Sequence, residues 1–346
     1  MQRLDQLRRH LDKETMIGIE IGPFFNPVAP KSEGWNTVVV DTQDGQALRA
    51  AARNHTEEVI RQRVGNIEDV DIVWSGQPLD VVALERNPGG YDFLVASHVI
   101  EHTPDMLSFL QQCSRLLKPE GIISLGVPDM RKCFDLLKAP TGIREILAAH
   151  RERRVRHVPE TLFEARSRAA MRGNKGAWVS GDQSAIGLAH PFDHALQSYK
   201  EDLANSSTPG PYVDAHAWFF TPSLFQLVVM ELHAMGLLSL KIAWLEENLG
   251  SEFIVQMRRA HPIEVMSPAE LSAERIRLTL KHYAEFDREV GPSYRSVALP
   301  EKEVVEVPVT VIVEVPVKAL PEPTLDLAKR LASRILRKVL SLLGVA

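Results

Sequence analysis

The sequence predicts an α/β protein with a doubly wound, mostly parallel seven-stranded sheet that ends in an antiparallel hairpin and is followed by a helical C-terminal extension. Three observations predict this fold class. Short apolar runs alternate with helix-patterned stretches from Met16 to about Leu125, as in βαβ units. A later helix precedes two further apolar runs that are separated by turn residues. The 346 residues, 45% of them hydrophobic, can bury a sizeable core.

The parallel strands are expected in the first part of the chain, where the spacing suits right-handed crossovers. A helix from about Pro104 to Leu117 should be separated from the next strand by a turn at Lys118-Pro119-Glu120-Gly121, because proline cannot continue a helix. The five expected strands are residues 16–21, 37–40, 70–74, 91–96 and 121–127.

The stretch from about 130 to 220 has a looser pattern, which we interpret as an insertion and not as a second sheet. Thr221 and Pro222 then favour the start of a helix that runs to about Met235 and is closed by Gly236. Two strands should follow, at 238–245 and 252–258, and pair as an antiparallel hairpin.

A first domain is therefore predicted over residues 1–260, with the insertion inside it. A capping box at Ser267-Pro268-Ala269-Glu270 begins a helix to about Val290 within a helical extension, 261–300. Residues 301–323 are predicted to be a Pro/Val/Glu-rich extended linker, because the repeated prolines block a central strand. Residues 324–346 should form an amphipathic basic helix, suited to a membrane surface or to a partner.

Composition argues against several classes of protein. The net charge of −5 offers no basic field for a nucleic acid, so no nucleic-acid partner is expected. Cys113 and Cys133 do not form a CxxC pair, which favours two reduced thiols in a cytosolic protein. The sequence has no run of about eighteen apolar residues, so no membrane span is predicted.

Two acidic residues and a glycine lie at the carboxyl ends of the first two expected strands. Glu20 and Gly22 end the first, and Asp41 ends the second. In an open α/β sheet the ligand lies beyond the carboxyl ends of the strands, where Asp41 can accept hydrogen bonds from ribose hydroxyls and Gly22 allows close backbone approach. Because no G-x-G-x-x-G pattern follows, a pyrophosphate ligand is disfavoured, and an NAD-dependent oxidoreductase with it.

These segments resemble class I S-adenosylmethionine-dependent methyltransferases, which have a Rossmann-like fold. EIGPFFNP is similar to a divergent first motif of that family, and YDFLVASHVIEHTPDM followed by LLKPEGIISLGVPD is similar to its fourth and fifth strands with the helix between them. DAHAWFFTPSLFQLV and EFIVQMRR resemble its last helix and strands. Within the family, the chain most resembles bacterial enzymes found with glycosyltransferases of surface polysaccharide synthesis.

The resemblance implies S-adenosylmethionine as cofactor and O-methylation of a sugar hydroxyl in a glycan as the reaction, with N-methylation as the nearer variant. It also implies a glycosyltransferase partner. From the residues themselves, we expect a cytoplasmic protein with a peripheral contact at the inner membrane through the basic amphipathic helix, 324–346. The insertion would cover the acceptor site. The implied cofactor contacts are Glu20 and Gly22 at the methionine part, Asn26 in the first loop, Asp41 at the ribose, Ser75 and Gly76 at the adenine, and Ser97 and His98 along the flank.

Methyl transfer needs an aligned acceptor and, where a proton must leave, a base with a pKa near 7, which directs attention to histidines. The sequence does not choose among the candidates, which are His98, His102, His190, His194, His216 and Asp214. The spacing of His190 and His194 with Asp214 and His216 is compatible with a metal site. Because these residues come from a poorly patterned region, we expect solvated histidines and assign no metal.

A noncatalytic adaptor with a degenerate nucleotide-binding fold is the alternative from a different class of function. In that case the proline-rich linker and the terminal helix would bring the protein to its partners. A cofactor pocket filled by Phe24 or Phe25 would favour the adaptor.

Overall fold

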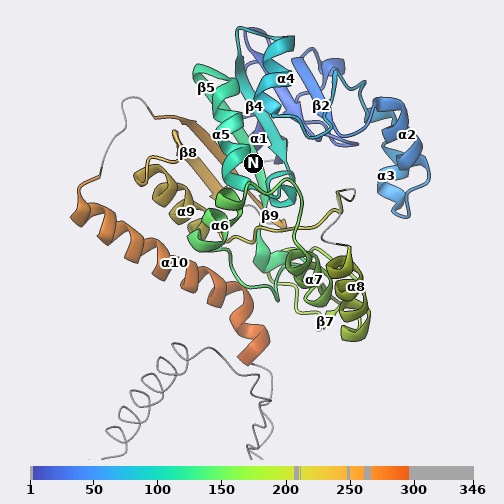
Figure 1. Cartoon of the computed structure of the whole chain (residues 1–346), viewed down its shortest axis with the longest axis vertical. Coiled ribbons are helices and arrows are strands. Elements are labelled where there is room, and N and C mark those ends of the chain that lie inside the picture. The colour runs from blue at the N-terminus through green and yellow to red at the C-terminus, as the bar shows by residue number, and fades with distance from the viewer. Residues whose placement is uncertain (1–2, 206–209, 211, 248–249, 261–265, 296–346) are drawn as a thin grey trace, which may run out of the picture. The chain divides into compact units, whose positions relative to one another are not determined.

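The computed structural model describes residues 3–205, 210, 212–247, 250–260 and 266–295. Its main sheet has seven strands in the order β3-β2-β1-β4-β5-β9-β8, of which β9 runs antiparallel to both of its neighbours (Figure 1). The predicted doubly wound, Rossmann-like fold class is thereby confirmed. The strands are β1 (Ile17–Ile21), β2 (Asn36–Asp41), β3 (Ile72–Val73), β4 (Tyr91–Ser97), β5 (Leu117–Pro128), β8 (Leu240–Glu247) and β9 (Glu252–Arg259).

Helices cover this sheet and connect its strands. They are α1 (Arg3–Leu7), α2 (Gly45–Arg53), α3 (Glu58–Gln62), α4 (Leu79–Arg86), α5 (Met106–Leu116), α6 (Ile143–Glu152), α7 (Pro159–Ser167), α8 (Phe192–Ala204), α9 (Pro222–Ala234) and α10 (Pro268–Arg295). Among the described residues, no helix combines the length and the apolar composition needed to cross a bilayer.

The core lies on both faces of the central strands. β4 reads as a continuous apolar run, with Phe93, Leu94 and Val95 all buried, because both faces of this strand are covered. Phe225 of α9 packs edge-on against Phe253 of β9, with ring centroids 5.8 Å apart. Helices that pack tightly on both faces of the sheet therefore fix the position of the carboxyl ends of its strands.

The junction of α5 and β5 differs from the predicted turn. β5 begins at Leu117, which pairs with Tyr91 before the register shifts between Tyr91 and Phe93. Lys118 to Gly121 therefore lie inside an irregular strand. Pro119 is tolerated there because a shifted register does not require a donor at every position.

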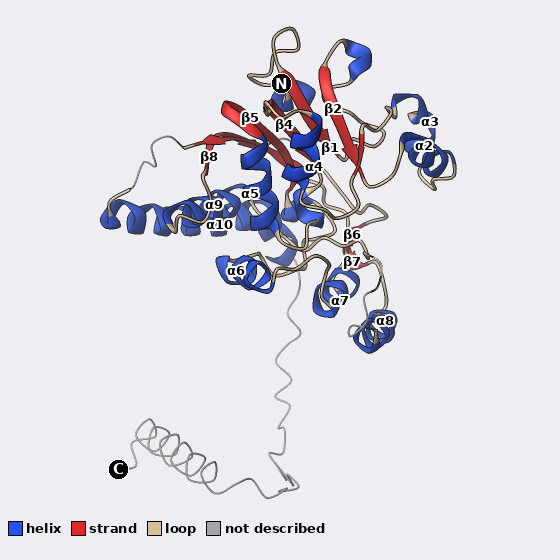
Figure 2. Cartoon of the chain, turned by 45° about the horizontal axis from the view of Figure 1, so that its top comes forward, coloured by secondary structure: helices blue, strands red, loops and turns tan. Residues whose placement is uncertain are grey.

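The prediction that the region from 130 to 220 contains no second sheet is wrong. β6 (Ala170–Arg172) and β7 (Ile186–Leu188) form a small antiparallel sheet beside α6, α7 and α8. Strands of three residues are too short for a two-residue periodicity to stand out in the sequence. Figure 2 shows α6, α7 and α8 gathered below the main sheet, and Phe163 of α7 packs against Tyr199 of α8 at 5.3 Å between ring centroids.

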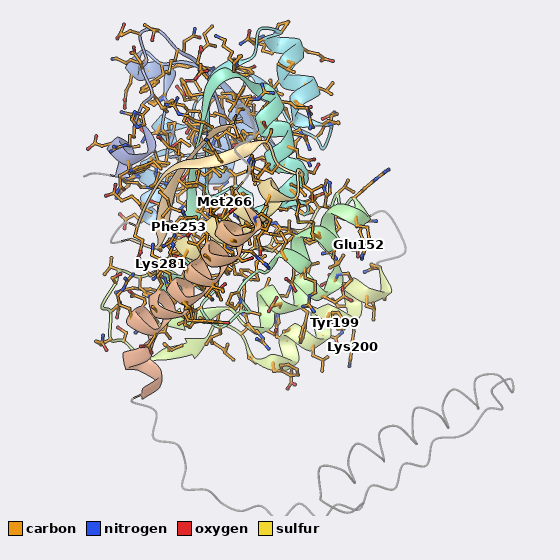
Figure 3. The ribbon with its side chains drawn as sticks, turned by 90° about the vertical axis from the view of Figure 1, so that its left-hand side faces the viewer. Glu152, Tyr199, Lys200, Phe253, Met266 and Lys281 are labelled. Atoms are coloured by element: carbon orange, nitrogen blue, oxygen red, sulfur yellow. The ribbon has the colours of Figure 1, made fainter. Side chains whose placement is uncertain are left out.

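The C-terminal elements begin where the capping signals predict. The backbone N–H of Leu224 donates to Thr221 Oγ1 at the start of α9, and the N–H of Ser267 donates to Glu270 Oε2 in the capping box before α10. The long helix α10 runs along the body (Figure 3) and is fixed to it, because Ser223 donates from both its N–H and its hydroxyl to the buried Glu285. The predicted linker, 301–323, and the predicted terminal helix, 324–346, lie outside the described residues.

Candidate active site

The carboxyl ends of β1, β2 and β4 meet at one edge of the sheet. Ile21, the last residue of β1, pairs with Val40 of β2 on one side and with Ala96 of β4 on the other. Strand order reverses at β1, which is the position where open α/β sheets bind ligands. Gly22, Asp41 and Ser97 follow directly from these pairs, so the structure brings together three of the predicted cofactor contacts.

The loop after β1 uses left-handed backbone at two residues. Gly22 has φ 62° and Phe24 has φ 42°, and the N–H of Gly22 donates to the carbonyl of Val40. A Cβ on Gly22 would lie 3.2 Å from Val99 Cγ2, so a side chain there would also be crowded. Phe24 and Phe25 pack edge to face with each other and against the apolar cluster of α2 and α3. Both rings are therefore engaged with these helices.

Glu20 of β1 holds the loop that follows this strand through hydrogen bonds to its backbone. Its carboxylate accepts hydrogen bonds from the backbone N–H groups of Val28 and Ala29, at 2.6 and 2.9 Å. Burial raises the pKa of Glu20 to about 7, although both amides favour the charged form. The contact of Glu20 with a cofactor stays a prediction, since this geometry describes a residue that shapes the loop.

Asp41 is half-buried at the end of β2, and its carboxylate accepts from the N–H of Thr42 at 2.7 Å. Burial raises its pKa above the ordinary value, partly opposed by backbone amides. The loop after β3 adjoins it, because the N–H of Trp74 donates to the carbonyl of Asp41. In that loop Ser75 hydrogen-bonds with Gln77, and Gly76 has φ 98° with open space where a Cβ would stand.

Asn26 lies farther along the first loop. Its side-chain oxygen accepts from Arg63 Nη1 at 3.3 Å. The loop conformation around it is a short turn, in which the N–H of Asn26 donates to the carbonyl of Pro23. A contact between Asn26 and a cofactor stays a prediction.

Two residues that the sequence analysis did not single out hold the end of β4. Arg3 of α1 donates to Ser97 Oγ at 2.5 Å and to both carboxylate oxygens of Glu252 on β9. Glu252 in turn contacts His98 Nε2 at 3.0 Å. No local signal marks Arg3 or Glu252, because their roles arise from strand and helix neighbours far away in the chain.

His98 is strained and lies between two carboxylates. It has φ 55°, rare for a residue other than glycine, and its Nδ1 lies 3.4 Å from Glu101 Oε1. Burial lowers its pKa, but the carboxylates of Glu101 and Glu252 outweigh that effect and raise the pKa to about 10. The two carboxylates thus favour the imidazolium form of His98, so the structure favours other members of the site as the base.

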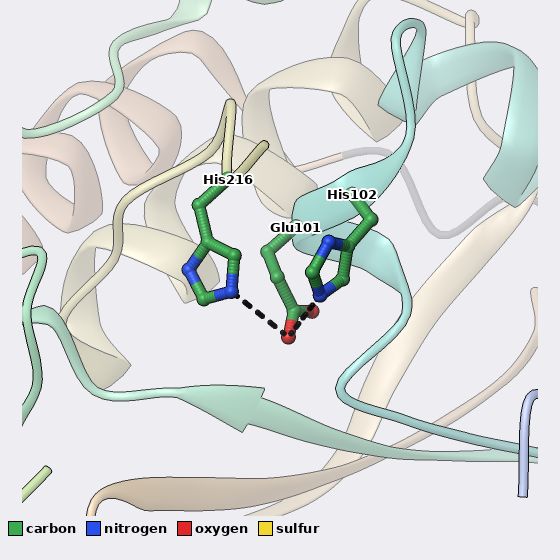
Figure 4. Close-up of side chains that lie close together, drawn as sticks. All are labelled: Glu101, His102 and His216. Carbon is green, nitrogen blue, oxygen red and sulfur yellow. Dashed lines mark ion pairs between the residues drawn. The ribbon is translucent and has the colours of Figure 1, made fainter. Parts of the chain in front are cut away.

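Glu101 lies at the centre of a histidine cluster. Its side chain is 1% exposed, and its Oε1 is 3.7 Å from His102 Nε2 and 3.9 Å from His216 Nε2 (Figure 4). Burial acts to raise the pKa of Glu101, but the neighbouring histidines, His98 foremost, lower it below the ordinary value. We call Glu101, His102 and His216 the Glu101 cluster.

Each histidine of the Glu101 cluster is held by a carboxylate on its other ring nitrogen. His102 Nδ1 lies 2.8 Å from Asp214, and His216 Nδ1 lies 2.7 Å from Asp135. Hydrogen bonding to His102 lowers the pKa of Asp214 to about 2, and His216 with Lys138 lowers that of Asp135 to about 2 against the effect of burial. Of the predicted catalytic residues, His98, His102, Asp214 and His216 therefore come together.

His190 and His194 are placed differently. Both are exposed near the start of α8, with ring centroids 5.4 Å apart. No contact among the described residues joins them to Asp214 or to His216. The metal-compatible grouping of His190, His194, Asp214 and His216 is therefore not assembled. Instead, His216 lies beside Glu101 and His102.

A cavity of about 300 Å³ is lined by sequence neighbours of the cluster residues but by none of the three residues themselves. It is bounded by residues that include Pro104, Arg144, His157 and Trp218, and His157 Nε2 lies 3.1 Å from the carbonyl of His102. Burial lowers the pKa of His157 to about 4, so this histidine is neutral at pH 7. A second cavity, of about 420 Å³, lies between α9, β8 and α10. Gly22 and Asp41 line neither of these two cavities.

Comparison with known proteins gives one family match. Residues 16–123 match the family model described as a methyltransferase domain. In Vibrio cholerae serotype O1, the curated ubiquinone biosynthesis O-methyltransferase of three strains is 35% identical over 63 residues, which is 18% of this chain and 25% of the relative. The chain thus spans a quarter of the length of these relatives.

Solved structures of methyltransferases are also similar. The CcbJ methyltransferase of Streptomyces caelestis has 12% identity and a TM-score of 0.36 over 75% of this chain and 97% of that one. The mitomycin 7-O-methyltransferase MmcR has 13% identity and a TM-score of 0.34 over 74% and 53%. Likeness at this level adds nothing to the fold, which the strand order already establishes. The segment that carries the strand-end residues, 16–123, is similar in sequence to a methyltransferase domain.

Proposed function

We propose that the protein is an S-adenosylmethionine-dependent methyltransferase that acts on a hydroxyl group. One observation carries the proposal: the segment that matches the methyltransferase domain, 16–123, is the segment whose strands end in Gly22, Asp41 and Ser97 at the reversal of strand order. The oxygen acceptor is supported by the curated relatives, which are O-methyltransferases by name.

The strand ends suit a nucleoside with a charged sulfur. Asp41 offers a half-buried carboxylate for ribose hydroxyls, while Gly22 allows the backbone to approach the cofactor. Ser97 and His98 then follow along the cofactor toward the Glu101 cluster. In this pose the methyl group lies near the end of β4, and the region from α6 to α8 covers the acceptor.

Methyl transfer is an in-line displacement in which an acceptor oxygen attacks the methyl carbon, the carbon–sulfur bond breaks and its electron pair stays on sulfur. The hydroxyl proton must leave to a base. The carboxylates around His98 favour its charged form, and the pKa values of Asp214 and Asp135 are about 2, so the candidate bases left at the site are His102 and His216.

Calorimetry with S-adenosylmethionine tests the cofactor. We expect Asp41→Ala to weaken binding at least ~10-fold, because each ribose hydrogen bond to a charged acceptor contributes about 1.5–3 kcal/mol. Asp69→Ala is the matched control, since that carboxylate is exposed and, among the described residues, forms an ion pair with Arg49. Absence of binding at about 1 mM cofactor would reject the proposal.

The acceptor is proposed to be a sugar hydroxyl of a glycan. This finer statement rests on the resemblance of the chain to enzymes of surface polysaccharide synthesis. A methyl-transfer assay over glycans and lipid-linked sugars, read by mass gain and by the position of the new methyl group, tests it. Methylation confined to amines, or to acceptors without sugar, would contradict the proposal while leaving the cofactor assignment intact.

A further inference from the structure

We propose that Glu101, His102 and His216 bind a divalent transition-metal ion at the carboxyl end of β4. One ligand atom from each residue lies within 4.8 Å of the others, in a buried to half-buried position. The three side chains converge on one point, with both Nε2 atoms directed toward Glu101 Oε1 (Figure 4). Of these ligands only His216 belongs to the grouping with metal-compatible spacing in the sequence, which also contained His190, His194 and Asp214.

The first argument comes from distances within the same rings. The Nδ1 atoms of His102 and His216 are 2.8 and 2.7 Å from their carboxylates, which is hydrogen-bond distance. The Nε2 atoms stand 3.7 and 3.9 Å from Glu101. Tetrahedral ligands with bonds of about 2.0–2.2 Å lie roughly 3.4 Å apart, so these gaps need to close by only a few tenths of an ångström around an ion.

The second argument is the state of Glu101 itself. Its side chain is 1% exposed, yet no contact to either carboxylate oxygen has hydrogen-bond geometry, and the charged group at Oε1, His98 Nδ1, stands off at 3.4 Å. A buried carboxylate without hydrogen-bond partners is costly. Because Glu20, Asp135 and Glu252 all have hydrogen-bond partners, Glu101 differs from the other buried carboxylates near the sheet edge. A metal ion at the cluster supplies the direct contact that His98, at 3.4 Å, does not make.

The third argument is the set of residues behind the histidines. Histidines that bind a metal commonly donate their second N–H to a carboxylate, which orients the ring and increases its basicity. His102 and His216 donate in this way to Asp214 and Asp135. Each carboxylate also accepts a second hydrogen bond, Asp214 from the hydroxyl of Tyr212 and Asp135 from Lys138. Both ligand rings therefore have a fixed orientation before any ion arrives.

The ligand set indicates the class of ion. Two imidazoles and one carboxylate suit Zn²⁺ or Fe²⁺, whereas Mg²⁺ and Ca²⁺ prefer oxygen ligands alone. Three protein ligands leave at least one coordination position open for water or for an oxygen of another molecule. The inference does not depend on the proposed methyl transfer, because metal uptake and cofactor binding are measured separately and either can fail alone.

The test is titration of the full chain, stripped with a chelator, with Co²⁺ and Zn²⁺. Co²⁺ gives visible absorption bands when it is held by nitrogen and oxygen ligands, and calorimetry with Zn²⁺ gives the stoichiometry. We expect one ion per chain, with affinity at least ~100-fold weaker in Glu101→Gln and in His102→Ala. Asp214→Asn, which loses only the support behind His102, should weaken binding about 10- to 100-fold.

His190→Ala combined with His194→Ala is the matched control, because it removes two exposed histidines and should leave the bound ion unchanged. A thermal melt checks the fold of each variant. If Glu101→Gln does not fold, His102→Ala carries the test, since its side chain is 30% exposed. No uptake at about 1 mM Co²⁺ or Zn²⁺ would overturn the proposal. The proposal would also be overturned if His102→Ala still bound the ion, or if the double variant His190→Ala and His194→Ala no longer bound it.

Discussion

The two ends of the candidate site are built in different ways. At the end of β1, Glu20 bonds to amides only 8 and 9 residues farther along the chain. At the end of β4, His216 meets Asp135 across 81 residues, and His102 meets Asp214 across 112. At the end of β1, a side chain bonds to backbone amides of the loop that directly follows it. At the end of β4, charged side chains from distant elements bond to one another. The shape of the loop after β1 is therefore a local property, whereas the charged groups at the end of β4 depend on the whole fold.

The largest effect is expected at the strand that supports the local end. A Cβ on Gly18 of β1 would stand 2.0 Å from the ring of Phe93, which is itself fully buried. Gly18→Ala should therefore lower the free energy of unfolding by about 1–3 kcal/mol, as overpacking of a dense core does. Denaturant unfolding measures this. A loss below about 0.5 kcal/mol would show that β1 yields easily and that the local end is less rigid than we infer.

A pH profile of stability sharpens the description of the local end. The pKa of Glu20 is about 7 in the folded protein against an ordinary value of 4.5. Because the folded state holds this proton more tightly, Glu20 contributes stability that is complete below about pH 4.5 and is lost as the pH rises through 7. We expect Glu20→Gln to flatten the profile between these values. An unchanged slope would mean that Glu20 does not titrate in that window.

The distant network should respond in a different pH window, and more weakly, because His98 is partly exposed. Its pKa is about 10 in the folded protein and 6.5 ordinarily. The pairing with Glu101 and Glu252 therefore stabilises the fold fully below pH 6.5, and this contribution is lost as the pH rises through 10. His98→Gln should remove that slope while leaving the window of Glu20 unchanged. If His98→Gln also changes the dependence of stability on pH between 4.5 and 7, the two ends are coupled and the contrast between them fails.

Much of the fold follows from local patterns in the sequence. The apolar runs of β1, β2 and β4 and the capping residues Thr221 and Ser267 predict elements that the structure contains. The strands β6 and β7 could not be predicted in the same way, because three residues carry too little periodicity and their pairing depends on the surrounding insertion.

The candidate site divides along the same line. Glu101 lies next to His102 within the motif YDFLVASHVIEHTPDM, but no local pattern indicates that it is buried, and nothing near Asp135 or Arg3 marks either residue. Their roles exist because α1, the region after β5 and the segment before α9 all return to the end of β4.

The sequence by itself determined the strands of the main sheet and the helices between them, the glycine and carboxylate at the sheet edge, and the likeness to a methyltransferase domain. These properties depend on neighbours a few residues apart, which hydrogen bonding and two- or 3.6-residue periodicity relate directly. Only the tertiary structure decided which histidines meet, that the charged form of His98 is favoured, and that no contact to the buried Glu101 carboxylate has hydrogen-bond geometry. Burial and long-range charge pairing set these features, and both arise only once distant segments have packed together.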